Sequence, residues 1–178
     1  MTIICAMHDP DAKCTWIGSD GQCNDTGTIF TGVKKWAAGE FWAVAAAGNL
    51  RTVNLLIRHS DALFLNLESP FEFSCRARDL LRDDDYNTDK DEGPKSFRQH
   101  MILANYEGVW SIGPTFEVME FGPGQFCADG SGYRLALGAA HVALGKGISA
   151  EETLRLAIDA AKRYDDHCGG LTFIGKLE

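Results

Sequence analysis

The succession of strand-like and helix-like segments is the feature that most constrains the fold of this 178-residue chain. Short β-prone runs fill the first quarter, a helical pattern follows, β-prone runs return, and two helical patterns lead to a last strand-like run. Strands and helices do not alternate regularly, which argues against a parallel sheet built from βαβ units. The order predicts an α+β fold of two stacked antiparallel sheets with helices outside them.

The β-prone runs are separated by turn-forming residues. "DPDA" between the first two runs is typical of a chain reversal, so these runs are expected to form a hairpin. "EG" and "GPG" interrupt the later runs, which we expect to be consecutive antiparallel strands. The expected strands cover residues 2–8, 14–21, 27–36, 40–48, 100–110, 114–130 and 169–177.

Three segments before residue 148 contain helical pieces. The segment 49–64 places one buried face on Leu50, Val53, Leu56 and Ile57. The segment 69–97 combines one short helical piece with an acidic run, "DDDYNTDKDEG", which lacks the glycine and glutamate positions of a calcium-binding loop and is expected to be a solvated loop. In 131–147 the expected face comprises Leu135, Gly138, Ala139 and Val142.

The segment 149–164 carries the clearest helix signal. Ser149 and Glu152 form a capping box, in which the first side chain accepts a backbone N–H and the second lies three residues later. Its apolar stripe contains Leu154, Ala157, Ile158 and Ala161.

Composition and charge exclude several classes of protein. The length fits a single domain over residues 1–178, and a net charge of −8 with a pI near 5.1 argues against a nucleic-acid-binding surface. The sequence shows no export signal and no run long enough to span a membrane, so we expect a cytoplasmic protein. Its six cysteines are then expected to be reduced thiols, and their spacing gives no support to a zinc site.

The threonine directly after Met1 raises a chemical possibility. If Met1 is removed, Thr2 carries a hydroxyl and a free α-amine, which are a nucleophile and a base on one residue. The ordinary pKa of an α-amine, about 7.7–8.0, already lies near neutrality, and a nearby cation would lower it further. A lysine is the natural source of that cation.

Several motifs resemble those of the proteasome β-subunit superfamily of N-terminal nucleophile hydrolases, in particular the bacterial HslV-type peptidases and their small proteobacterial homologues. "MTIICAMH" looks like the processed start, "GSDGQ" is similar to the Asp-Gly-Gln turn, and "TGVKKW" occupies the place of the lysine strand. "ADGSGYRLALGAA" resembles the Gly-Ser-Gly start of a helix, and "RYDDHCGG" is a weaker match. The resemblance runs nearly end to end and implies a four-layer αββα sandwich of two antiparallel sheets flanked by helices, the Ntn-hydrolase fold.

Carried over by this resemblance, Thr2 would be the nucleophile and Asp20 would orient the lysine. Lys35 is a better match than its neighbour Lys34 and would depress the pKa of the amine. The residues that would hold the amine are Ser131 and Asp165.

Two positions depart from the family pattern. Cys168 replaces the second serine of the family, and Asp166 beside Asp165 leaves the choice of aspartate open. The glycine that usually donates its backbone N–H to the oxyanion is replaced by alanine, and the pattern places Ala45 or Ala46 there.

The resemblance implies a threonine-type endopeptidase that needs no metal or organic cofactor. Thr2 would attack a peptide carbonyl in a peptide or unfolded protein, and water would hydrolyse the resulting ester. Homo-oligomeric stacked rings would enclose the threonines, and related peptidases work with an ATPase unfoldase. Two alternatives stay open: a catalytically silent ring or scaffold subunit, which retention of Met1 would favour, and an amidase of the same nucleophile class acting on a small molecule.

Overall fold

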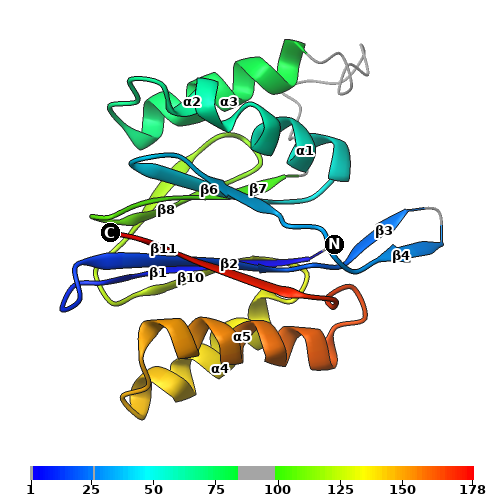
Figure 1. Ribbon diagram of the computed structural model, residues 1–178, viewed down its shortest axis with the longest axis vertical. Coiled ribbons are helices and arrows are strands. Elements are labelled where there is room, and N and C mark those ends of the chain that lie inside the picture. Colours follow the sequence, from blue (N-terminus) through cyan, green and yellow to red (C-terminus); the bar gives the residue numbers. More distant parts are fainter. Residues whose placement is uncertain (1, 26, 84–98) are drawn as a thin grey trace.

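The computed structural model describes residues 2–25, 27–83 and 99–178 of the chain. Two antiparallel sheets lie face to face, and helices cover the outer face of each sheet, as Figure 1 shows. The layers are therefore helix, sheet, sheet and helix, which confirms the predicted αββα sandwich.

The first sheet contains the strands nearest to both chain termini. Its four strands run in the order β10, β1, β2, β11, with bounds Phe126–Gly130, Ile3–Asp9, Cys14–Asp20 and Thr172–Leu177. Strands β1 and β2 are antiparallel neighbours closed by the pairing of Asp9 with Cys14, so the predicted hairpin is confirmed. The predicted last strand pairs with β2.

The second sheet has five strands in the order β5, β6, β7, β8, β9, with bounds Trp36–Ala38, Trp42–Ala47, His100–Asn105, Val109–Ile112 and Val118–Phe121. One expectation about this region is wrong, because β9 and β10 are not neighbours in one sheet. Strand β9 ends the five-stranded sheet, whereas β10 pairs with β1 at the edge of the other. The "GPG" segment therefore carries the chain from one sheet to the other.

A small ribbon of two strands projects from the sandwich (Figure 1). It consists of β3 (Cys23–Asp25) and β4 (Thr28–Phe30), and Ile29 and Phe30 are 60% and 48% exposed. A two-stranded ribbon is only marginally stable by itself in water. In the single chain, the apolar side chains of this ribbon are therefore exposed to solvent.

Three helices cover the five-stranded sheet, namely α1 (Leu50–Arg58), α2 (Ser60–Phe64) and α3 (Pro70–Asp83). The single helix expected over 49–64 is divided at His59, and the Ser60 hydroxyl donates to the Ile57 carbonyl oxygen at this break. The short helical piece expected in 69–97 is α3, with 14 residues. The acidic run expected as a solvated loop lies, after Asp83, outside the described residues.

Helices α4 (Tyr133–Gly145) and α5 (Ala150–Tyr164) cover the four-stranded sheet. The predicted cap of α5 is present, since the Ser149 side chain accepts the Glu152 N–H at 3.4 Å. All four residues of its predicted stripe are buried. The helix thereby supplies five of the twelve buried residues in the apolar core between this layer and the sheet.

The face predicted for α4 is wrong. The buried residues are Ala136, Ala140 and Ala143, whereas Leu135 and Val142 are 37% and 54% exposed. Alanine methyl groups let α4 pack closely against neighbouring elements, and bulkier side chains would hold it away. Residue size decided which face of this mostly apolar helix is buried.

Candidate active site

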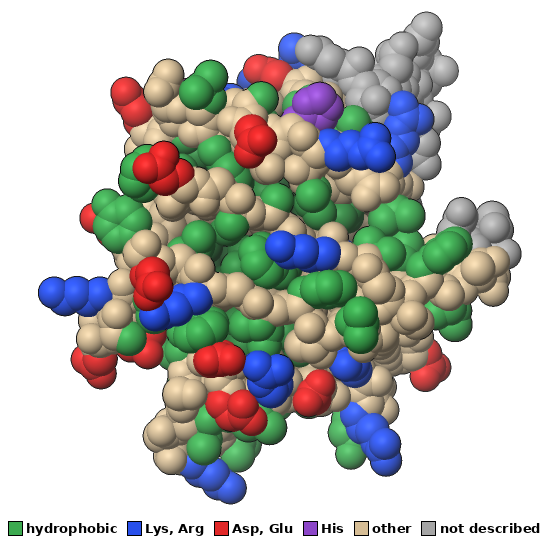
Figure 2. Space-filling view, in the orientation of Figure 1, with side chains coloured by type: hydrophobic (Ala, Val, Ile, Leu, Met, Phe, Trp, Pro, Cys, Tyr) green, Lys and Arg blue, Asp and Glu red, His purple; other side chains and the backbone are tan. Residues whose placement is uncertain are grey.

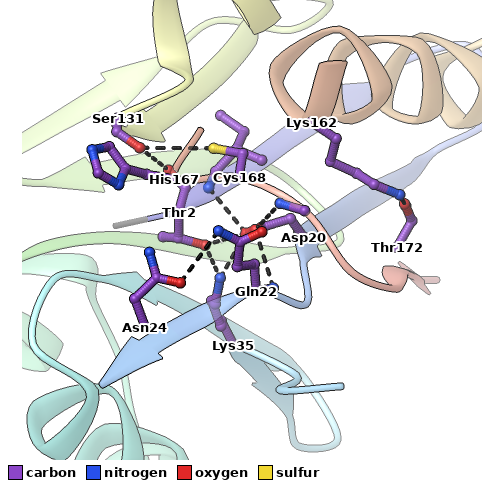
Figure 3. Close-up of polar contacts among 12 residues, drawn as sticks. Thr2, Asp20, Gln22, Asn24, Lys35, Ser131, Lys162, His167, Cys168 and Thr172 are labelled. Carbon is purple, nitrogen blue, oxygen red and sulfur yellow. Dashed lines mark hydrogen bonds and ion pairs between the residues drawn. The ribbon is translucent and has the colours of Figure 1, made fainter. Parts of the chain in front are cut away.

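Thr2 lies directly before β1 and is buried, with 3% of its surface exposed. The antiparallel hairpin brings the end of β2 beside the start of β1, because Ile4 pairs with Ser19. Asp20, the last residue of β2, is therefore next to Thr2. Lys35 reaches the same place from the segment just before β5, as Figure 3 shows.

The carboxylate of Asp20 organises this cluster. Its Oδ1 accepts the Ile3 N–H at 3.1 Å and the Lys35 ammonium at 2.7 Å, and it also accepts the Thr2 hydroxyl. Its Oδ2 accepts the N–H groups of Gln22 at 3.2 Å and Gly169 at 2.9 Å. Asp20 is fully buried, so these donors replace the water that an ionised carboxylate requires.

Lys35 contacts both other members of the cluster. Its Nζ donates to the Thr2 hydroxyl oxygen and to Asp20. Burial lowers the pKa of Lys35, and the charge and hydrogen bond of Asp20 oppose that shift. Lys34 is instead exposed, with its Nζ 3.5 Å from the centre of the Trp36 ring. The Thr2 hydroxyl thus lies between a carboxylate acceptor and a cationic donor.

A second set of polar side chains lies on the other side of Thr2 (Figure 3). The Ser131 hydroxyl donates to the Thr2 carbonyl oxygen at 3.4 Å and lies 3.7 Å from the Cys168 sulfur. Cys168 in turn donates to Asp165 Oδ2 at 3.5 Å. Burial raises the pKa of the Cys168 thiol to about 12, so it is a neutral hydrogen-bonding group here.

Asp165 and its neighbour Asp166 have different surroundings. Burial tends to raise the pKa of Asp165, but hydrogen bonds from the His167 N–H, Ser131 and Cys168 outweigh it, so the pKa is lowered. The side chain of Asp166 is exposed, and its backbone oxygen accepts from the Gln22 amide at 3.0 Å. The structure therefore brings Asp165, through Cys168, into the network around Ser131.

Ala45, the residue expected to supply the oxyanion donor, lies inside β6 and not at its end. It is in the middle of β6 and pairs with Trp36 on one side and Ile102 on the other. The N–H of Ala46 is likewise used, since it donates to the Lys35 carbonyl oxygen at 3.0 Å. Central strand residues use their backbone donors in the ladder, so neither fits the expected role.

Gly48 is a candidate that the prediction from sequence missed. It follows β6 directly, borders both hollows beside Thr2, and has a φ of 137°, which residues other than glycine rarely adopt. The signal was present in the sequence as the glycine that ends "WAVAAAG". The family pattern places the donor at Ala45 or Ala46 instead.

The two hollows beside Thr2 differ in size. One, of about 20 Å³, is bordered by Gln22, Cys23, Lys35 and Val53 among others. The larger one, of about 440 Å³, is lined by Thr2, Ala47, Gly48, His100, Ala128, Asp129, Gly130, Ser131 and Tyr133. A bound group in the larger hollow can therefore lie against Thr2.

The described residues contain no group of three or more histidine, cysteine or acidic side chains that could hold a metal ion. Within the same residues, no helix combines the length and the apolar character needed to cross a bilayer.

Comparisons with solved structures show that other proteins share this fold. The chain is similar to Thiobacillus denitrificans BPH, with 24% identity and a TM-score of 0.80 over all of this chain and 98% of the other. The same protein in complex with epoxomicin gives 23% identity and a TM-score of 0.78, with the same coverage. HslV from Trypanosoma brucei gives 19% identity and a TM-score of 0.73 over 99% of each chain. No protein-family model and no curated protein matches the sequence.

Proposed function

We propose that this protein is a threonine peptidase of the N-terminal nucleophile type, with Thr2 as nucleophile once Met1 is removed. The observation that carries the proposal is the buried contact of the Thr2 hydroxyl with both Asp20 and Lys35. Met1 lies outside the described residues, so its removal is part of the proposal. The proteasome/HslV-type fold and the similarity to a protein solved in complex with epoxomicin support it.

In the proposed reaction, the Thr2 oxygen forms a bond to the carbonyl carbon of a peptide. Its proton passes to the α-amine of the same residue, directly or through water, and then to the leaving amine. The charge of Lys35 favours the neutral, basic form of that α-amine. The backbone N–H of Gly48 is the donor that we assign to the oxyanion. Water hydrolyses the ester that remains on Thr2.

Ser131 and Asp165 hold the start of the chain in this scheme. Ser131 already contacts the Thr2 carbonyl, and the Gly132 N–H points to the same oxygen at 3.5 Å. Asp165 acts through the neutral thiol of Cys168, which takes the place of a hydroxyl. A thiol is a weaker hydrogen-bond donor than a hydroxyl, so this part of the network is looser than one built from serine.

The proposal extends to assembly and substrates. We propose peptides or unfolded proteins as substrates, stacked homo-oligomeric rings as the assembly, an ATPase unfoldase as partner, and the cytoplasm as location. The ring assembly is supported by the fold and by the exposed apolar ribbon of β3 and β4. A second copy of the chain would cover Ile29 and Phe30.

Intact mass before and after incubation with epoxomicin tests the proposal. A peptide epoxyketone needs a hydroxyl and a free amine on one residue, so the expected result is loss of Met1 and one adduct per chain. Thr2→Ala is the control and should form no adduct and hydrolyse no peptide. Retained Met1 without an adduct would instead indicate a silent subunit. Hydrolysis of simple amides but not of short peptides would indicate an amidase.

A further inference from the structure

The larger hollow beside Thr2 contains an ion pair that the proposed reaction does not use. His100 Nδ1 and Asp129 Oδ2 are 2.8 Å apart, at the start of β7 and near the end of β10. Both residues line the hollow together with Thr2. The pair therefore faces any group that occupies this space during attack by Thr2.

The walls of the hollow leave room for a side chain. Ala47, Gly48, Ala128 and Gly130 contribute little more than backbone and methyl groups. The polar groups lie together on His100, Asp129, Ser131 and Tyr133, so a ligand that extends past the small residues meets hydrogen-bonding atoms. A small-walled space with a few convergent polar groups is the usual form of a specificity pocket.

The two members of the ion pair differ in what they can offer a ligand. Asp129 already accepts two hydrogen bonds, from His100 through Oδ2 and from the Gly130 N–H through Oδ1 at 2.6 Å. The side chain of His100 is 41% exposed, and no described residue bonds its Nε2. With Nδ1 on Asp129, the available polar atom is His100 Nε2, which is an N–H donor when the ring is charged.

The electrostatic surroundings favour the charged ring. The hydrogen bond to Asp129 raises the pKa of His100, burial opposes this, and the charges of Asp129 and Glu117 add to the increase. Helix α4 also begins at the hollow, with no side chain capping its N-terminus and no acidic residue in its first turn. The positive end of its dipole would attract an anionic ligand to the same space.

Resting on the proposed function, we propose that His100 selects substrates with a carboxylate side chain in this hollow, and that Asp129 positions the imidazole. The imidazolium Nε2–H would donate a charge-assisted hydrogen bond to the substrate carboxylate. A neutral amide of the same shape would receive a weaker bond. The substrate class is thus peptides with glutamate or aspartate beside the scissile bond.

Peptide binding to the Thr2→Ala variant tests this inference without turnover. A neutral peptide, blocked at both ends, is prepared with one glutamate at each position in turn and compared by titration calorimetry with its glutamine counterpart. At one position we expect glutamate to bind about tenfold more tightly than glutamine, as a charge-assisted bond would give. His100→Gln, which keeps a donor for Asp129, should remove this preference, and Asp129→Asn should weaken it. His141→Gln on the exposed surface of α4 is the matched control and should retain it.

Three results would overturn the inference. The first is equal binding of the glutamate and glutamine peptides at every position. The second is tighter binding of a peptide with lysine, which would make Asp129 the group that selects the substrate. The third is no binding of any of the peptides. The glutamate preference is measured in a variant that cannot react, so it does not depend on catalysis. If the wild-type protein forms no epoxomicin adduct but the Thr2→Ala variant prefers glutamate, the catalytic proposal is refuted and the pocket assignment stands.

Discussion

At the scale of single residues, Asp20 and Lys35 depend on each other. Asp20 is 0% exposed, and its ionised form is stabilised by the Lys35 ammonium and three backbone N–H groups. Removing one partner of a buried ion pair leaves an uncompensated charge, which costs about 3–5 kcal/mol. The pair is therefore structural as well as chemical.

Lys35→Met should lower the free energy of unfolding by about 3 kcal/mol, toward the low end of that range because the backbone donors remain. The double variant with Lys35→Met and Asp20→Asn should lose less unfolding free energy than the sum of the two single variants, since it has no unpaired buried charge. Urea unfolding of the four proteins gives this coupling. Lys34→Met, at the exposed neighbour, should change stability by less than about 1 kcal/mol. Additive effects of the two buried changes would contradict the pairing.

Asp165 should contribute stability in a pH-dependent way. Its pKa is lowered in the folded protein, so the contribution is present above the unfolded pKa, near 3.9, and disappears as the pH falls through the folded value. Asp165→Asn should therefore cost about 1 kcal/mol at pH 7, a low value for bonds to a charged group because the side chain is partly exposed. The difference from wild type should vanish at acid pH in urea titrations.

Asp166→Asn is the matched control for that experiment, because the Asp166 side chain is exposed. It should be as stable as wild type at both pH values. A larger effect at Asp166 than at Asp165 would reverse the assignment of the two aspartates.

At the scale of elements, the start of α4 packs closely against the end of α5. A Cβ on Gly132 would lie 2.7 Å from the Ala161 methyl carbon and 2.9 Å from the Cys168 sulfur. Such distances require the two helices to move apart. Because Ser131 precedes Gly132 directly, the movement would reach the Thr2 carbonyl.

Gly132→Ala should accordingly destabilise the protein by about 1–3 kcal/mol through overpacking, and it should reduce formation of the epoxomicin adduct. At Gly138 in the same helix, nothing lies within 4 Å of the position of an added methyl group. Gly138→Ala should therefore raise the free energy of unfolding by about 0.5–1 kcal/mol. Thermal unfolding and adduct mass measure both effects. Equal behaviour of the two variants would show that α4 is not tightly held at this end.

At the scale of the whole molecule, apolar side chains lie exposed beside the site. Ile29 and Phe30 on the ribbon are joined by Leu171, which is 61% exposed and bonds through its N–H to the Thr31 carbonyl oxygen. Figure 2 shows hydrophobic side chains on this part of the surface, at the right of the view, where Figure 1 places the ribbon. Exposed apolar patches of this kind mark protein contacts.

Replacing both Ile29 and Phe30 by lysine should shift the assembly toward smaller species in light scattering with size-exclusion chromatography. The charges would have to be buried in the contact with a second copy. Phe71→Lys on α3 is the control, because Phe71 is at least as exposed as Ile29 and Phe30 but lies in a helical layer. It should leave the assembly size unchanged. A double variant that assembles like wild type would exclude the ribbon as a contact.

The layer order could be predicted from local signals in the sequence, and most of the candidate site from motif resemblance. Turn residues and apolar periodicity predicted the β1–β2 hairpin and the capped helix α5, since both depend on neighbours in the sequence. The Thr2, Asp20 and Lys35 positions came from motif resemblance, and the structure brings these three side chains together.

Only the tertiary structure decided the features that depend on packing between distant segments. The buried face of α4 was decided by how closely α5 and the sheet approach it, and periodicity gives no such distance. The partner of β10 depended on which sheet edge was free. Gly48 was distinguished from Ala45 by the geometry at the strand end, and the pairing of His100 with Asp129 joins β7 of one sheet to β10 of the other. These features depend on contacts between residues far apart in the sequence, which a local sequence pattern does not record.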